Sequence, residues 1–196
     1  YMQRTLELAQ LGQYTCAPNP MVGCVIVRDS EVIGEGFHAK TGQAHAEINA
    51  LAQAGERARG ATVYVSLEPC CHQGRTGPCT EALIQAGVAA VHIACLDPNP
   101  KVAGNGARRL EQAGIHVSVG TLADEAEQLN RVFFHYMRTQ LPFVTVKWAM
   151  SLDGKIATHA GDSRWITSDA ARQHTHELRQ RVSAVIVGSG TVLADD

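Results

Sequence analysis

The order of strand-like and helix-like segments places the strongest restriction on how this chain can fold. A helix expected over residues 2–13 precedes two β-branched runs, 22–28 and 32–37, which Asp29-Ser30 would join as a hairpin. The segments after the hairpin are expected as a helix at 45–54, a strand at 61–67, a helix at 79–85, a strand at 88–96, a helix at 106–113, a strand at 115–119 and a helix at 122–137. Such alternation predicts one sheet covered by helices, that is, an α/β domain.

The pattern restarts after the turn-forming segment Gln140-Leu141-Pro142. A strand is expected at 144–149, a turn at Asp153-Gly154, a helix at 168–180 and a strand at 184–188. The chain has 196 residues, more than the roughly 100–150 of a usual single domain. The sequence therefore predicts a first domain over 1–143 and a second over 144–196, which we expect to be incomplete because so few elements cannot close a core.

Charge and composition exclude several classes of protein. Lys and Arg number 17 against 19 Asp and Glu, and aromatic residues make up 5%, so neither a basic field nor stacking platforms for nucleic acid are expected. No apolar run approaches the roughly 20 residues that span a bilayer. The first expected helix carries Arg4 and Glu7, unlike the core of a signal peptide. We expect a cytoplasmic protein with neither a nucleic-acid nor a membrane partner.

Five of the six cysteines fall into two groups. Cys24 and Cys95 lie inside apolar strand-like runs, which favours small buried thiols. Cys70, Cys71 and Cys79 instead lie among Pro and Gly after a strand, where side chains can converge on a metal. Without a secretory signal, reduced thiols or metal ligands are more plausible than three disulfides.

A His-x-Glu pair and two cysteines predict the chemistry of that cluster. His45 and Glu47 open one expected helix, and Glu68-Pro69-Cys70 is expected to open the next, with Cys79 nine residues after Cys70. Nucleobase-type zinc deaminases hold one Zn²⁺ with one His and two Cys and leave the fourth position to water. The sequence therefore predicts His45, Cys70 and Cys79 as zinc ligands and Glu47 as the catalytic group that transfers the proton.

Two alternatives remain open on the residues alone. A closed, non-catalytic zinc module would need a fourth ligand, for which Cys71 and His72 are the local candidates. A zinc deaminase acting on tRNA or on free nucleosides is the other alternative, although the common enzymes of that kind separate their two cysteines by two residues and this chain separates them by eight.

Longer motifs around the cluster carry a resemblance to a known family. HAE and LEPCCHQGRTGPC, with PNPMVG upstream and DPNP downstream, resemble the deaminase half of the bifunctional riboflavin-biosynthesis deaminase/reductase family. One departure is Gly77-Pro78-Cys79, where the family usually reads Pro-Pro-Cys. The resemblance implies a cytidine-deaminase-like αβα domain with a mixed sheet. It also implies hydrolytic deamination of 2,5-diamino-6-ribosylamino-4(3H)-pyrimidinone 5′-phosphate.

Four residues are implied as substrate contacts of this deaminase. Asn19 matches the position expected to contact the pyrimidine, and Arg75 has the charge suited to the 5′-phosphate. His72 would add a donor beside Arg75, and His38 would face the pocket. The plain alternatives are that Asn19 is only a turn residue and Arg75 only a solvated charge.

The second region resembles the reductase half of the same family, whose fold is similar to dihydrofolate reductase. The resemblance lies in KWAMSLDGKIA, GDSRWIT and VGSGTVLADD. It implies NADPH-dependent reduction of the ribosyl side chain to ribityl, and a homo-oligomer, either a dimer or a tetramer. The residues implied are Ala149, Trp165, Thr191 and Asp195 for NADPH, and Lys147, Ser163 and Arg179 for the phosphorylated substrate.

Overall fold

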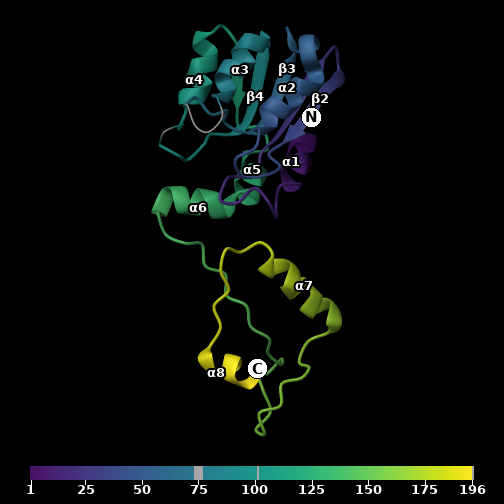
Figure 1. Cartoon of the computed structure of the whole chain (residues 1–196), viewed down its shortest axis with the longest axis vertical. Helices are drawn as coiled ribbons and strands as arrows, with labels where there is room; N and C mark the ends of the chain where they lie inside the picture. Colours follow the sequence, from purple (N-terminus) through teal and green to yellow (C-terminus); the bar gives the residue numbers. More distant parts are fainter. Residues whose placement is uncertain (73–76, 101, 196) are drawn as a thin grey trace. The chain divides into compact units, whose positions relative to one another are not determined.

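A computed structural model describes residues 1–72, 77–100 and 102–195 of the chain (Figure 1). The chain divides into two units, Tyr1–Phe143 and Val144–Asp196, and each is described by itself. No helix among the described residues is both long enough and apolar enough to cross a membrane.

The first unit is built on a five-stranded mixed sheet in the order β2-β1-β3-β4-β5. β1 pairs antiparallel with both β2 and β3, whereas β3, β4 and β5 run parallel. The strands are β1 (Gly23–Arg28), β2 (Glu31–Phe37), β3 (Thr62–Leu67), β4 (Ala90–Cys95) and β5 (His116–Val119). The mixed sheet expected from the sequence is confirmed. Asp29 and Ser30 both have positive φ, as a two-residue hairpin turn requires.

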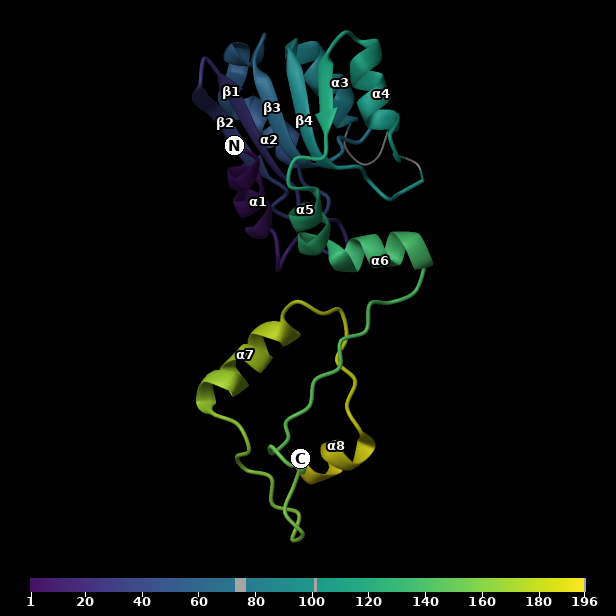
Figure 2. The ribbon, with the colours of Figure 1, turned by 180° about the vertical axis from the view of Figure 1, so that it is seen from behind.

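Helices cover both faces of this sheet (Figures 1 and 2). The helices of the unit are α1 (Met2–Gln10), α2 (Ala46–Ala54), the short 3₁₀ helix η1 (Gly55–Ala58), α3 (Cys79–Ala86), α4 (Asn105–Gln112), α5 (Ala123–Leu129) and α6 (Arg131–Thr139). One face packs against α2, α3 and α4, and the other packs against α1, α5 and α6. The result is an αβα sandwich.

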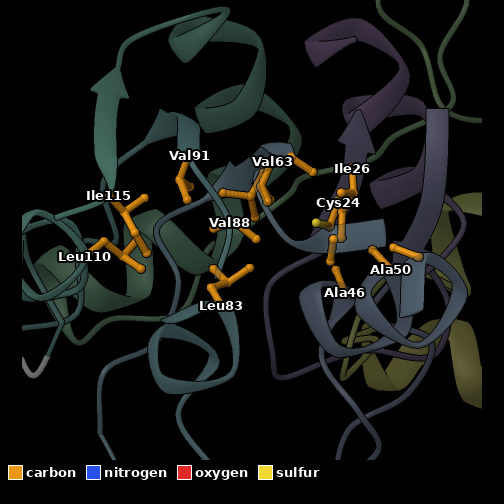
Figure 3. Close-up of a cluster of buried hydrophobic side chains, with 14 of the residues drawn as sticks. Cys24, Ile26, Ala46, Ala50, Val63, Leu83, Val88, Val91, Leu110 and Ile115 are labelled. Carbon is orange, nitrogen blue, oxygen red and sulfur yellow. The ribbon is translucent and has the colours of Figure 1, made fainter. Parts of the chain in front are cut away.

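Successive side chains along the strands point to opposite faces of the sheet, so a hydrophobic core forms on each face. Cys24 and Ile26 of β1 point into the core shared with α2, α3 and α4 (Figure 3). Val25, between them, packs on the opposite face with Leu8 of α1. Cys24 and Cys95 are both buried and all six cysteines are free, which confirms the expectation of small buried thiols in the strands.

Two glycines let α2 lie directly against the sheet. A Cβ at Gly34 would be 2.3 Å from the carbonyl oxygen of Ala50, and one at Gly36 would be 2.3 Å from that of Ala46. Any larger residue at either position would force α2 away from β2. These contacts therefore set the depth of the helix that begins directly after His45 and carries Glu47 in its first turn.

The helix expected over 122–137 is wrong as a single element, because the chain forms α5 and α6 with a break at Asn130. Asn130 is buried, and its Nδ2 donates to the carbonyl oxygen of Met21 while the Met21 N–H donates to its Oδ1, both at 2.8 Å. The Asn130 amide thus provides hydrogen-bond partners for the backbone of a loop 109 residues away in the sequence. Local helical periodicity cannot predict such a contact. α1 likewise ends at Gln10, earlier than the predicted Gln13.

The described residues of the second unit form two helices, α7 (Asp169–Arg179) and α8 (Ser189–Asp195). Ser168 caps α7, with its side chain accepting the N–H of Ala171. The turn predicted at Asp153-Gly154 is present, but the strands predicted at 144–149 and 184–188 do not form among the described residues. A strand needs backbone partners on a neighbouring strand, and residues 144–195 form no strand that could provide them. Trp148 and Ile186 are exposed.

Candidate metal centre

Three side chains converge where β3 meets the starts of α2 and α3. The possible ligand atoms of His45, Cys70 and Cys79 all lie within 4.8 Å of one another. His45 Nδ1 is 3.2 Å from Cys79 Sγ and 3.6 Å from Cys70 Sγ. His45 is the residue before α2, Cys70 follows β3, and Cys79 is the first residue of α3. The structure brings together the three residues that the sequence selected.

The helix expected at Glu68-Pro69-Cys70 is wrong, since the chain stays non-helical there and α3 begins at Cys79. Cys70 nevertheless faces the start of that helix. Its Sγ accepts the Cys79 N–H at 3.3 Å, and its carbonyl oxygen accepts the Thr80 N–H at 3.2 Å. Two N–H groups of the first turn, which have no partner within a helix, are thereby satisfied by the neighbouring ligand residue.

The donor set fits zinc. One imidazole nitrogen and two sulfurs are ligands that Zn²⁺ accepts, and three protein ligands leave the fourth tetrahedral position for a reacting molecule. Neither Cys71 nor His72, both within the described residues, belongs to the group of converging ligands, and His72 is exposed. The arrangement thus favours an open site over the closed four-ligand alternative.

The two thiols differ in protonation. The pKa of Cys70 is lowered to about 4, first by the hydrogen bond from the Cys79 thiol and then by His45. The pKa of Cys79 is raised, because its proton is held by Cys70 and because it is buried. The pair therefore keeps one proton between two sulfurs, and a bound divalent cation would replace that proton.

Glu47 lies in the first turn of α2 beside the ligands and is only 3% exposed. Burial, followed by the negative charge of Cys70, raises the pKa of its carboxyl group to about 7. A carboxyl group that titrates near neutral pH can both accept and return a proton, as a general acid–base catalyst must. Its catalytic role stays a prediction.

Of the four implied substrate contacts, two lie next to the converging side chains. Asn19 Nδ2 lies 3.0 Å from His38 Nε2, and the His38 ring meets the ring of the ligand His45 edge-on, with 5.3 Å between centroids. Burial lowers the pKa of His38, and neighbouring His45 lowers it further. His72 is an exposed residue beyond Cys71, and Arg75 lies outside the described residues. The structure thus joins Asn19 and His38 to the metal ligands.

Sequence reasoning did not anticipate two carboxylates next to Cys70. Glu68 is 3% exposed and accepts three backbone N–H groups, from Asp97, Gly104 and Ala107. Asp97 accepts the N–H of Asn99, and burial raises the pKa of its carboxyl group to about 6. The sequence signal for both is an acidic residue just after a buried strand. A carboxylate without hydrogen-bond partners would be costly at such a position, which indicates that partners are present.

The residues implied for the reductase remain apart. They are all exposed except Ala149, which is half-buried, and Asp195, the last residue of α8, whose side chain lies outside the description. No hydrogen bond or ring contact among residues 144–194 joins any two of them; the Trp165 ring instead lies under the guanidinium of Arg172. Their roles stay predictions.

Two family profiles match the chain. The profile described as the cytidine and deoxycytidylate deaminase zinc-binding region matches residues 1–95, which include all three converging ligands and Glu47. The profile described as the RibD C-terminal domain matches residues 142–196.

Comparison over the whole chain finds similar curated proteins. The chain is 56% identical over all 196 residues to riboflavin biosynthesis protein RibD of Escherichia coli, covering 53% of that protein. The chain is therefore similar over its whole length to a RibD protein. The RibD of Aquifex aeolicus is 50% identical over the same 196 residues, with 55% of its length covered.

Solved RibD structures are similar to this chain as well. A structure of Acinetobacter baumannii RibD superposes with a TM-score of 0.95 at 55% identity, covering 100% of this chain and 55% of that one. The deaminase/reductase of Thermotoga maritima superposes with a TM-score of 0.93 at 47% identity, covering 100% of this chain and 56% of that one. The chain thus spans about half the length of the RibD proteins that it matches.

Proposed function

We propose that residues 1–143 form a zinc-dependent deaminase that removes an amino group from 2,5-diamino-6-ribosylamino-4(3H)-pyrimidinone 5′-phosphate. The observation that carries the proposal is the convergence of His45, Cys70 and Cys79 beside the buried carboxyl group of Glu47. The substrate is proposed from the family, since the printed name of the Thermotoga maritima structure is diaminohydroxyphosphoribosylaminopyrimidine deaminase/5-amino-6-(5-phosphoribosylamino)uracil reductase.

The residues of the chain divide the work of the reaction. Zn²⁺ held by the three ligands would supply Lewis-acid activation of the attacking water. Glu47 accepts the proton of that water at its carboxylate, keeps it out of solvent in its buried position, and returns it to the leaving amine. In the metal-free protein burial, followed by the negative charge of Cys70, raises the pKa of Glu47 to about 7, so neither form of its carboxyl group is strongly disfavoured there at neutral pH.

Substrate recognition is proposed to lie in the loops around the ligands. Asn19 would hydrogen-bond the pyrimidine, and Arg75, with His72 beside it, would bind the 5′-phosphate. A single placed guanidinium is enough for one phosphate, so the net charge of −2 is compatible with this substrate.

We further propose that residues 144–196 contribute to an NADPH-dependent reductase domain that reduces the ribosyl side chain to ribityl. The match to the RibD C-terminal domain supports this assignment. Ala149, Trp165, Thr191 and Asp195 would contact NADPH, while the phosphorylated substrate would contact Lys147, Ser163 and Arg179. The domain bounds of 1–143 and 144–196 belong to the same proposal.

The deaminase proposal is tested by ammonia release from this substrate with the zinc-loaded chain. Glu47→Gln should keep its zinc and lose activity by several orders of magnitude. Glu81→Gln is the matched control, because Glu81 lies in the first turn of α3 as Glu47 does in α2, but pairs with Arg109 at the surface. Full turnover by Glu47→Gln would refute the assignment, and zinc binding without any turnover by the unchanged chain would favour the non-catalytic module.

The phosphate contact has its own test. Arg75→Ala should raise KM for the phosphorylated substrate while leaving zinc content unchanged, and Arg57→Ala, on η1, is the surface control. Equal turnover of phosphorylated and dephosphorylated substrate by the unchanged chain would remove the phosphate role.

We also propose a cytoplasmic location and a homo-oligomer, either a dimer or a tetramer. The six free cysteines support a reducing compartment. Light scattering of the zinc-loaded chain measures the oligomeric state, and a monomer at micromolar concentration would contradict the proposal.

A further inference from the structure

The side chain of His38 connects two loops next to the metal ligands. It follows β2 and is only 3% exposed, and its two ring nitrogens contact different partners. Nδ1 lies 3.2 Å from the carbonyl oxygen of Ala44, the residue before the ligand His45. Nε2 lies 3.0 Å from Nδ2 of Asn19, in the loop before β1.

These two partners fix where the ring carries its proton. A carbonyl oxygen can only accept, so the contact to Ala44 requires a hydrogen on Nδ1. The amide nitrogen of Asn19 can only donate, so the contact at Nε2 requires a lone pair there. His38 is therefore the neutral tautomer with its hydrogen on Nδ1, and both nitrogens are satisfied.

The same tautomer determines the orientation of the Asn19 amide. An asparagine amide can rotate to exchange its oxygen and its nitrogen, and the two orientations offer opposite hydrogen-bonding groups to a ligand. With only a lone pair at His38 Nε2, the rotated form would place the Asn19 oxygen against that lone pair. The ring thus selects the form in which Nδ2 faces His38 and Oδ1 faces away.

From this geometry we propose that His38 is a positioning residue: it holds the Asn19 amide in one orientation, so that Asn19 presents a hydrogen-bond acceptor to the substrate. Asn19 is partly exposed and can reach a ligand, whereas His38 is almost fully covered and acts through Asn19. The inference deepens the proposed function and rests on it for the identity of the substrate.

Neighbouring contacts keep the two loops in register around the ring. The backbone N–H of His38 donates to the carbonyl oxygen of Val22 at 2.9 Å. The hydroxyl of Thr41 donates to the carbonyl oxygens of Cys16 and Ala17. These bonds tie the segment after β2 to the loop that carries Asn19.

Nuclear magnetic resonance of the zinc-loaded chain tests the tautomer without any substrate. Two-bond correlations between ring hydrogens and ring nitrogens distinguish hydrogen on Nδ1 from hydrogen on Nε2. We expect Nδ1–H for His38, and we expect the signals of the Asn19 side-chain amide to shift in His38→Phe and to stay unchanged in His92→Phe, a histidine of β4. A hydrogen on Nε2 of His38 would overturn the inference.

Steady-state kinetics tests whether His38 acts through Asn19. His38→Phe and Asn19→Ala should each raise KM by up to about tenfold, the effect of one hydrogen bond, with little change in kcat or zinc content. The double variant should be no worse than Asn19→Ala alone. Effects that multiply to about a hundredfold would mean that His38 contacts the substrate independently, and would overturn the inference.

The two experiments separate failure of this inference from failure of the proposed function. If the unchanged chain releases no ammonia from the diaminopyrimidinone phosphate, the proposed function fails, and the tautomer together with the Asn19 amide signals still decides whether His38 holds Asn19. If ammonia is released but the hydrogen is on Nε2, the positioning role fails and the deaminase stands.

Discussion

The buried carboxylate of Glu68 makes a strong prediction about stability. Its Oε2 accepts the N–H of Asp97 at 3.1 Å and of Gly104 at 2.9 Å, and its Oε1 accepts the N–H of Ala107 at 3.1 Å. Gly104 and Ala107 belong to the start of α4, whose first N–H groups have no partner within the helix. The side chain of Glu68, the residue after β3, thus fastens the segment from Asp97 to α4 two residues before the candidate ligand Cys70.

Replacing Glu68 by Gln keeps the shape but removes the charge and one acceptor. Hydrogen bonds to charged groups contribute about 1.5–3 kcal/mol each, against about 1 kcal/mol for neutral ones. The glutamine oxygen can keep two of the three bonds as neutral bonds, while its NH₂ group faces the third N–H. Allowing for the smaller desolvation cost of an amide, we expect the free energy of unfolding to fall by about 3 kcal/mol.

Urea unfolding of the zinc-loaded chain measures this loss. Glu127→Gln is the matched control, since Glu127 pairs with Arg138 at the surface and should change stability by less than about 0.5 kcal/mol. Hydrogen exchange should also become faster at the Gly104 and Ala107 amides in Glu68→Gln. If Glu68→Gln were as stable as the control, with unchanged exchange at both amides, the reasoning would be refuted.

Three further predictions concern packing and protonation. Gly106→Ala places a Cβ 2.2 Å from a backbone carbonyl oxygen and should cost about 1–3 kcal/mol in thermal unfolding, whereas Gly77→Ala, which meets nothing within 4 Å, should cost little. Asn130→Ala loses two hydrogen bonds to the Met21 backbone and should lower stability by about 2 kcal/mol despite its better helix propensity; a raised melting temperature would contradict this. In the zinc-free protein the pKa of Glu47 is raised from 4.5 to about 7, so the folded state binds this proton more tightly than the unfolded state does. The free energy of unfolding should therefore fall by on the order of 3 kcal/mol as the pH rises from about 4.5 to about 7. Denaturant titrations across that range should show a flatter profile in Glu47→Gln.

The local sequence pattern was sufficient to predict the elements whose structure depends on residues close in the sequence. The alternation of residues in β1, the hairpin at Asp29-Ser30 and the start of α2 at His45 follow from side-chain periodicity and turn chemistry. The three side chains that converge as candidate metal ligands were also predicted, because His, Cys and Pro at those spacings are typical of zinc sites.

The predicted helices and strands were wrong where contacts between residues distant in the sequence determine the structure. The helix expected at Pro69-Cys70 does not form, because the carbonyl oxygen and the sulfur of Cys70 are used by the start of α3. The helix expected over 122–137 breaks because Asn130 binds the backbone near β1. The strands expected at 144–149 and 184–188 have the composition of strands but lack neighbours to pair with.

For this protein the sequence alone predicted an α/β domain and a zinc site made of one His, two Cys and one Glu. The tertiary structure decided how those groups are held. The depth of α2 depends on contacts at Gly34 and Gly36, the Cys70 segment is fastened by Glu68, and the Asn19 amide is oriented by His38. Residue types are local information, whereas the distances and the proton positions between them arise only when remote segments pack together.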